Sequence, residues 1–260
     1  MIRTLRAGAA GVILAATPAA AFAHDTFLTS PGTLAAGQPI RLGIGSGTFP
    51  DIETGLRPER IARITARAAD TPLIPAPATG DRITRLTLDW PTAAPAHQNG
   101  VVVAVDLTPM PIRVGPEEIE HYLDEIGAPA DVAAAARAAV ARDGAMRETY
   151  TKHLKLLACI VTCDGLAPSR PTGAALEFVA ADEAWRLLEN GRPRGGQAVF
   201  VSTPSQGRRR LTTNRSGLIL LPADLTGPVF LSAVVLTPPT ESDGPFTSEW
   251  ATLTIDASVR

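Results

Sequence analysis

The sequence is short of aromatic residues, long apolar runs and excess basic charge, and each shortage excludes a class of protein. Aromatic residues make up 5% of the chain, too few to favour a carbohydrate-binding platform of exposed rings. After residue 23 no run approaches the roughly 20 apolar residues that a membrane-spanning helix needs. A formal net charge of −2 leaves no electrostatic footprint for nucleic acid. The one basic cluster, Arg208–Arg210, is predicted to be a solvated hairpin loop.

The first residues have the organisation of an export signal. Arg3 and Arg6 give a positive start, residues 7–21 form a short apolar run, and Ala21-Phe22-Ala23 fits the small-x-small rule for signal peptidase. We expect residues 1–23 to be a cleaved signal peptide and the mature protein to be periplasmic or secreted, with no integral membrane segment. Cleavage would leave 22 of the 24 basic and all 26 acidic residues.

Alternation of apolar and polar residues dominates both ends of the mature chain. Residues 38–44 and 83–90 alternate over a strand length, and 101–107 is a continuous apolar run typical of a strand buried on both faces. We expect residues 24–115 to form an N-terminal β module. Alternation returns after residue 173 at spacings typical of a sandwich, so residues 174–260 are expected to form a C-terminal immunoglobulin-like or transthyretin-like module.

The period changes between these modules. Pro116 suits a first helical turn and Gly127 a helix end, with Ile119, Tyr122, Leu123 and Ile126 on one face. The Ala-rich segment 130–143 predicts a second helix, and the apolar spacing over 146–157 predicts a third. The expected fold is therefore mainly β, with two β-sandwich-like modules and a helical insert, residues 116–158, between them.

Two cysteines, Cys159 and Cys163, are separated by three residues. An exported protein meets an oxidising compartment, which favours a local disulfide between them. Such a bridge requires a bent segment, because an extended strand holds positions four apart at too great a separation. A thiolate metal site and free buried thiols are the alternatives.

The end that signal cleavage creates is the first functional candidate. A cut after Ala23 makes His24 the N-terminal residue, so that its α-amine and its imidazole Nδ1 can chelate one metal ion. The α-amine has a pKa of about 7.7–8.0, and these nitrogen donors suit Cu(II) and Ni(II). A cut after Ala21 places the histidine third, and the amine, two deprotonated amides and the imidazole then surround one ion. The alternative is that His24 simply begins a strand.

Four histidines occur in the chain, so His24 has few partners. His97 lies on a loop before the apolar run at 101–107, from which it could reach the N-terminus as a ligand, although solvent exposure is the simpler interpretation. His121 has a glutamate four residues away on either side, which favours a solvated helix face. His153 adjoins the apolar face of the third predicted helix, where a packed, hydrogen-bonded histidine is expected.

No arrangement of residues identifies an enzyme, and the sequence favours a non-catalytic protein. The glycine-rich segment 43–49 contains G-x-G-x-G, but Ser46 is not in a nucleophile elbow and no strand–turn–helix pattern follows to hold a dinucleotide. Acid pairs such as Asp51 and Glu53 are typical of surface charge unless they face one cleft.

An ordered set of short motifs covers nearly the whole mature chain. They are AHDTFL at the start, GTFP at 47–50, IEHYLDEIGA at 119–128, RETYTKHLKLL at 147–157, NGRPRGGQAVFV, TTNRSG at 212–217 and SEWATLTI at 248–255. In order and spacing this set resembles the exported bacterial family called domain of unknown function 4198. The resemblance implies two β-sandwich-like modules joined through a helical segment. Part of this family is linked to nickel and cobalt uptake systems, so the resemblance also implies a periplasmic component of such a system.

Residue by residue, the resemblance implies less. His24 and Asp25 match the start of the family. Trp250 lies in the closing strand, where a core role is expected. Family members commonly have a histidine in the penultimate strand, where this chain has Val234–Leu236. If that histidine is a ligand, the metal site is altered or missing here.

Two functions follow as expectations. The first is a non-catalytic periplasmic component that binds Ni, Co or Cu through His24, Asp25 and His97 and supplies a membrane metal transporter. The second is a metal-free β-sandwich protein with a structural, ligand-binding or protein-binding role, which would tolerate loss of His24. An oxidative copper enzyme would need His24, a second histidine and redox turnover.

Overall fold

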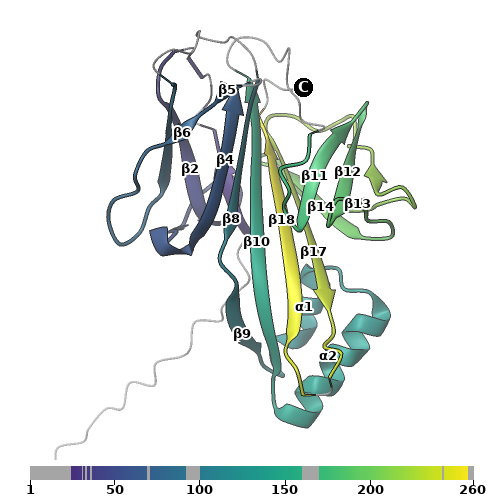
Figure 1. Cartoon of the computed structure of the whole chain (residues 1–260). Helices are drawn as coiled ribbons and strands as arrows, with labels where there is room; N and C mark the ends of the chain where they lie inside the picture. Colours follow the sequence, from purple (N-terminus) through teal and green to yellow (C-terminus); the bar gives the residue numbers. More distant parts are fainter. Residues whose placement is uncertain are drawn as a thin grey trace, which may run out of the picture.

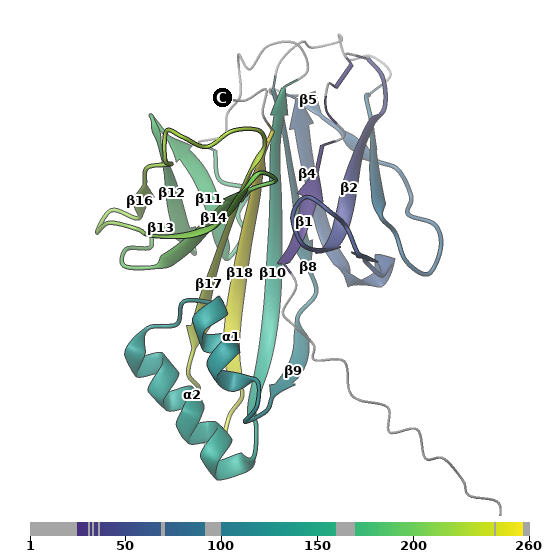
Figure 2. The same cartoon turned by 180° about the vertical axis from the view of Figure 1, so that it is seen from behind.

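The computed structural model describes residues 25–30, 32, 34–35, 37–68, 71–91, 100–159, 170–241 and 243–256. In that part of the chain the fold is mainly β, as expected, with a long central sheet of nine strands and smaller sheets of five and four strands (Figures 1 and 2). Hydrophobic cores fill both faces of the central sheet. Two β-sandwiches are therefore present, and they share one sheet.

The central sheet is antiparallel except where β10 runs parallel to β18. Strands β8 and β9 pair with the same edge of β10. Strand β9 pairs with the first residues of β10, and β8 pairs with its last residues. In spatial order the strands are β15 (Gln206–Thr212), β14 (Ala198–Thr203), β17 (Val229–Thr237), β18 (Phe246–Ile255), β10 (Met146–Cys159), β8 (Gly100–Leu107), β4 (Ile61–Ala68) and β5 (Thr71–Pro72), with β9 (Met110–Val114) off this path.

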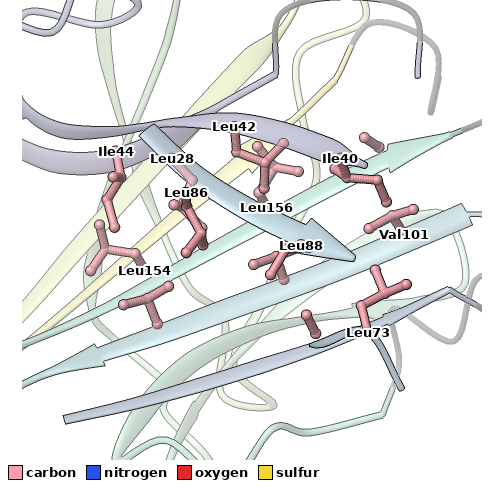
Figure 3. Close-up of a cluster of buried hydrophobic side chains, with 14 of the residues drawn as sticks. Leu28, Ile40, Leu42, Ile44, Leu73, Leu86, Leu88, Val101, Leu154 and Leu156 are labelled. Atoms are coloured by element: carbon pink, nitrogen blue, oxygen red, sulfur yellow. The ribbon is translucent and has the colours of Figure 1, made fainter. Parts of the chain in front are cut away.

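The five-stranded sheet covers one face of the central sheet. Its strands are β1 (Asp25–Thr29), β2 (Ile40–Gly47), β7 (Arg85–Asp89), β6 (Ile74–Pro75) and β3 (Thr54–Gly55), and the short helix η1 (Pro58–Arg60) follows β3. Leucine and isoleucine side chains from β2 and β7 meet Leu154 and Leu156 of β10 in this core (Figure 3). Strand β1 is also tied to β18, because Thr252 and Thr254 donate side-chain hydrogen bonds to the carbonyls of Thr26 and Leu28.

The four-stranded sheet packs on the opposite face. It consists of β11 (Leu176–Ala181), β12 (Ala184–Glu189), β13 (Arg192–Pro193) and β16 (Leu218–Ile219). Strand β8 contributes to both cores, with Val103 on the first side and Val102 on this one, which confirms the expected burial of both its faces. A buried ion pair joins the two sheets, because Lys155 Nζ donates to Glu177 Oε2 at 3.0 Å.

Two helices, α1 (Ile119–Glu125) and α2 (Ala130–Asp143), confirm the first two helical predictions. Their apolar faces pack with Met146, Phe246 and Trp250 into a third core on the lower part of the central sheet. Gly127 and Gly144 have φ values of 61° and 73°, so the left-handed conformation expected of a helix-ending glycine is present at both.

The third predicted helix is wrong, because residues 146–159 form β10. The apolar residues of this segment fit a helical period, but its centre is Thr149, Tyr150 and Thr151, residue types that favour strands. The position between β8 and β18 buries both faces of β10 from residue 152 to residue 159, so neither face of this part needs to be polar. Tertiary pairing therefore decides the conformation, and the helical segment ends before β10 begins.

The basic cluster is also not a loop. Arg208–Arg210 lies within β15, at the edge of the central sheet. Arg209 forms a bidentate ion pair with Asp224, at 2.9 and 2.7 Å, and the Arg208 guanidinium lies 3.7 Å from the centre of the Phe200 ring. These contacts explain the basic residues as local structural partners.

Candidate functional site

A cleft of about 1200 Å³ lies between the five-stranded sheet and helix α1, over the lower half of β10. Figure 2 shows β1 on one side of this region and α1 on the other, with β10 and β9 between them. One wall comes from β3, the following turn and η1, and the other from β9 and α1. Tyr150, Lys152 and Trp250, on neighbouring strands β10 and β18, form the floor.

Lys152 is the buried cation of this floor. Its Nζ donates a hydrogen bond to Thr26 Oγ1 at 3.0 Å and lies 4.9 Å and 5.5 Å from the ring centres of Trp250 and Tyr150. Burial lowers the pKa of Lys152 to about 8, against the opposing effect of carboxylates that include Asp25. A substantial fraction of this amine is therefore neutral at mildly alkaline pH.

A buried carboxylate lies beside the lysine. Glu148 accepts hydrogen bonds from Tyr122 Oη at 2.7 Å and from the Ser248 hydroxyl, which itself accepts one from Trp250 Nε1 at 2.9 Å. Burial raises the pKa of Glu148, and the hydrogen bonds from Ser248 and Tyr122 limit that rise. This network fixes the Trp250 ring and joins α1 to the floor of the cleft.

Three further polar residues belong to the elements on either side of this region. Asp25 is the first residue of β1, while His121 and Glu125 line the cleft from α1. Burial raises the pKa of Glu125, and the negative charge of Asp25 raises it further, whereas Arg208, His121 and Lys152 have the opposite effect. The two carboxylates thus repel each other electrostatically, and the positive charges of Arg208 and Lys152 already offset part of that repulsion.

The predicted ligands are only partly covered by the structure. His24 and His97 lie outside the described residues, and Asp25 lies in the arrangement above. Strand β8 begins at Gly100 opposite Cys159, six residues further along β10 than the pairing of Asp106 with His153. Within the described part of the chain no group of three or more histidine, cysteine, aspartate or glutamate side chains is assembled as a metal site.

The cysteine prediction is also only partly covered. Cys159, the last residue of β10, is disulfide-bonded. Cys163 lies outside the described residues, so the pairing of these two cysteines remains a prediction.

His153 lies in a separate cluster of charged groups. Its ring nitrogens contact Asp106 Oδ1 at 2.7 Å and Glu249 Oε2 at 2.8 Å, and Asp106 also accepts from Arg63 at 2.6 Å. Burial works against the charged imidazole, but the two carboxylates outweigh it and raise the pKa of His153 to about 9. The expectation of a packed, hydrogen-bonded histidine is confirmed, on a strand and not on a helix.

Sequence reasoning missed the floor of the cleft. Lys152, Tyr150 and Glu148 alternate on β10 and therefore face the same side, but the incorrect helical prediction separated them. Reading the segment with a period of two would have placed all three on one face and drawn attention to the lysine.

Scans against models of known protein families and a search of curated proteins find no match to this chain. The resemblance to the domain of unknown function 4198 family therefore remains an expectation. Among the described residues, no helix has the length and apolar character needed to cross a membrane.

Proposed function

We propose that this protein is an exported, non-catalytic binding protein that holds a Ni(II), Co(II) or Cu(II) ion at the entrance of the cleft and supplies it to a membrane metal transporter. The observation that supports the proposal is the electrostatic effect of Asp25 on Glu125, which lines the cleft together with His121 of the same helix. Because Asp25 directly follows His24 in the sequence, cleavage after Ala23 would add nitrogen donors next to this group.

The proposed ligand set combines hard and intermediate donors. The His24 amine and imidazole would supply two nitrogens, and His121 a third, which suits Cu(II) and Ni(II). Asp25 and Glu125 would neutralise the charge of the ion. His97, which lies outside the described residues, remains a predicted further ligand.

Calorimetric titration of the mature protein tests the proposal. Protein with a native His24 terminus is expected to bind one ion with micromolar or tighter affinity, and His24→Ala to abolish that binding. Glu125→Gln should weaken binding, since it removes a charge beside the ion. Glu59→Gln is the matched control, because Glu59 lines the other wall of the same cleft and is exposed. Equal affinity in all variants would contradict the proposal.

A metal-free ligand-binding protein is the second candidate. The cleft of about 1200 Å³ is far larger than one ion requires and exceeds the roughly 300–1,000 Å³ typical of small-molecule sites. Aromatic rings and several charged side chains line it. Retention of an organic ligand by protein stripped of metal would favour this candidate.

A further inference from the structure

The two walls of the cleft differ in charge. The wall from the five-stranded sheet and η1 contributes three arginines, with Glu59 as the one acid. The wall from β9 and α1 contributes three glutamates, with Arg113 as the one arginine. The three arginines are Arg57, Arg60 and Arg82, and the three glutamates are Glu117, Glu118 and Glu125. One side of the cleft is thus predominantly basic and the other predominantly acidic.

Residues of each sign at the rim are available for a ligand. Within the described part of the chain, the side chains of Arg57 and Glu117 form no hydrogen bond or ion pair, and both are exposed. Arg60 is held deeper, where Nη1 donates to the Met110 sulfur, Nη2 donates to the Thr108 carbonyl at 3.1 Å and the guanidinium lies 5.6 Å from the centre of the Tyr150 ring. Its Nε is buried and has no hydrogen-bond partner among the described residues.

An apolar surface lies between the charged walls. Leu56 lines the basic side, Ile112 lines the acidic side, and the rings of Tyr150 and Trp250 form the floor. The Lys152 amine lies over both rings, so an apolar or aromatic ligand group would contact Leu56, Ile112 and the rest of the Tyr150 ring. The cleft therefore offers a cationic contact, an anionic contact and an apolar contact to a single small molecule.

We propose that the cleft binds a zwitterionic ligand of the amino-acid class, with its carboxylate toward Arg57, its ammonium toward Glu117 and Glu125, and an apolar side chain against Leu56, Ile112 and the edge of Tyr150. Arginine suits carboxylate recognition because its guanidinium donates two parallel hydrogen bonds. A ligand with only one of the two charges would leave one wall unmatched. This inference does not depend on metal binding.

Titration of chelator-treated, metal-free protein with three related probes tests the inference. L-Phenylalanine has both charges, 3-phenylpropionate lacks the ammonium, and phenethylamine lacks the carboxylate. We expect L-phenylalanine to bind, and each singly charged analogue to bind at least about tenfold more weakly, since it lacks the hydrogen bonds of one charged group. Absence of L-phenylalanine binding at millimolar concentration, or equal binding of an analogue, would overturn the inference.

Variants assign the two contacts. Arg57→Gln should weaken L-phenylalanine binding while leaving phenethylamine binding unchanged. Glu117→Gln should also weaken L-phenylalanine binding, while leaving 3-phenylpropionate binding unchanged. Both positions are exposed, so the fold should persist, and far-UV circular dichroism checks it. Arg192→Gln, on the exposed β13 outside the cleft, is the matched control. Because metal is absent throughout, failure of this experiment and failure of the metal proposal are separate results.

Discussion

The Lys152 amine lies 4.9 Å from the centre of the Trp250 ring, and the two residues are paired in register on β10 and β18. The hydrogen bond from the amine to Thr26 also joins this pair to β1, at the entrance of the cleft. A strand of the five-stranded sheet and two strands of the central sheet thus meet at one buried cation. The environment of Lys152 therefore reports directly on the floor of the cleft.

Lys152 is expected to titrate near pH 8. The chain contains only two lysines, Lys152 and Lys155, so protein labelled with ¹³C-lysine has two ε-carbon signals. One signal should follow a titration near pH 8, because burial favours the neutral amine. Lys152→Met should remove that signal and leave the one from Lys155. A Lys152 titration near 10.5 would contradict the arrangement.

His153 is expected to stabilise the fold at neutral pH and to lose that effect in alkali. Its folded pKa of about 9 exceeds the ordinary value of 6.5, so the folded state binds the proton more tightly than the unfolded state. The stabilisation is fully present below pH 6.5 and is lost as the pH rises through 9. A pKa shift of this size contributes on the order of 3 kcal/mol to the free energy of unfolding.

Urea unfolding of wild type and His153→Asn at pH 6 and pH 10 measures this effect. The advantage of the wild type should be large at pH 6 and small at pH 10. His121→Asn in metal-free protein is the control, because His121 is exposed on α1. A wild-type advantage that does not change with pH would show that the two carboxylates do not hold the proton on His153.

The glycines of β2 are expected to be structural. A Cβ on Gly45 would lie 2.4 Å from Ile52 Cγ2 and 2.6 Å from the Thr54 carbonyl oxygen, so Gly45→Ala should destabilise the fold by about 1–3 kcal/mol. The displaced segment includes Thr54, which lines the cleft. Gly207→Ala is the control, since nothing lies within 4 Å of its added Cβ. Equal unfolding midpoints for the two variants would contradict this role.

Local patterns predicted much of the fold. The alternation in β2, the apolar run in β8 and the glycine after each helix are determined by neighbouring residues, and the structure confirms all of them. Strand β10 was predicted wrongly because its conformation depends on β8 and β18, from distant parts of the sequence. The sharing of one sheet by two sandwiches follows from the same long-range pairing.

The candidate site was less predictable than the fold. The sequence directed attention to Asp25, the first residue of β1, because of its position beside the expected cleavage site. It gave no sign that the charge of Asp25 acts on Glu125, the last residue of α1, since that interaction results from packing of the helix against the lower central sheet. Opposite charges on the two walls likewise arise from segments that meet only in the folded protein.

Electron paramagnetic resonance of the mature protein loaded with one equivalent of Cu(II) tests metal binding at the start of the chain most directly. Protein with a native His24 terminus is predicted to give an axial spectrum with coupling to several nitrogens, and His24→Ala to lose that coupling. An identical spectrum from both proteins, or the spectrum of hydrated Cu(II) from the wild type, would contradict the proposal.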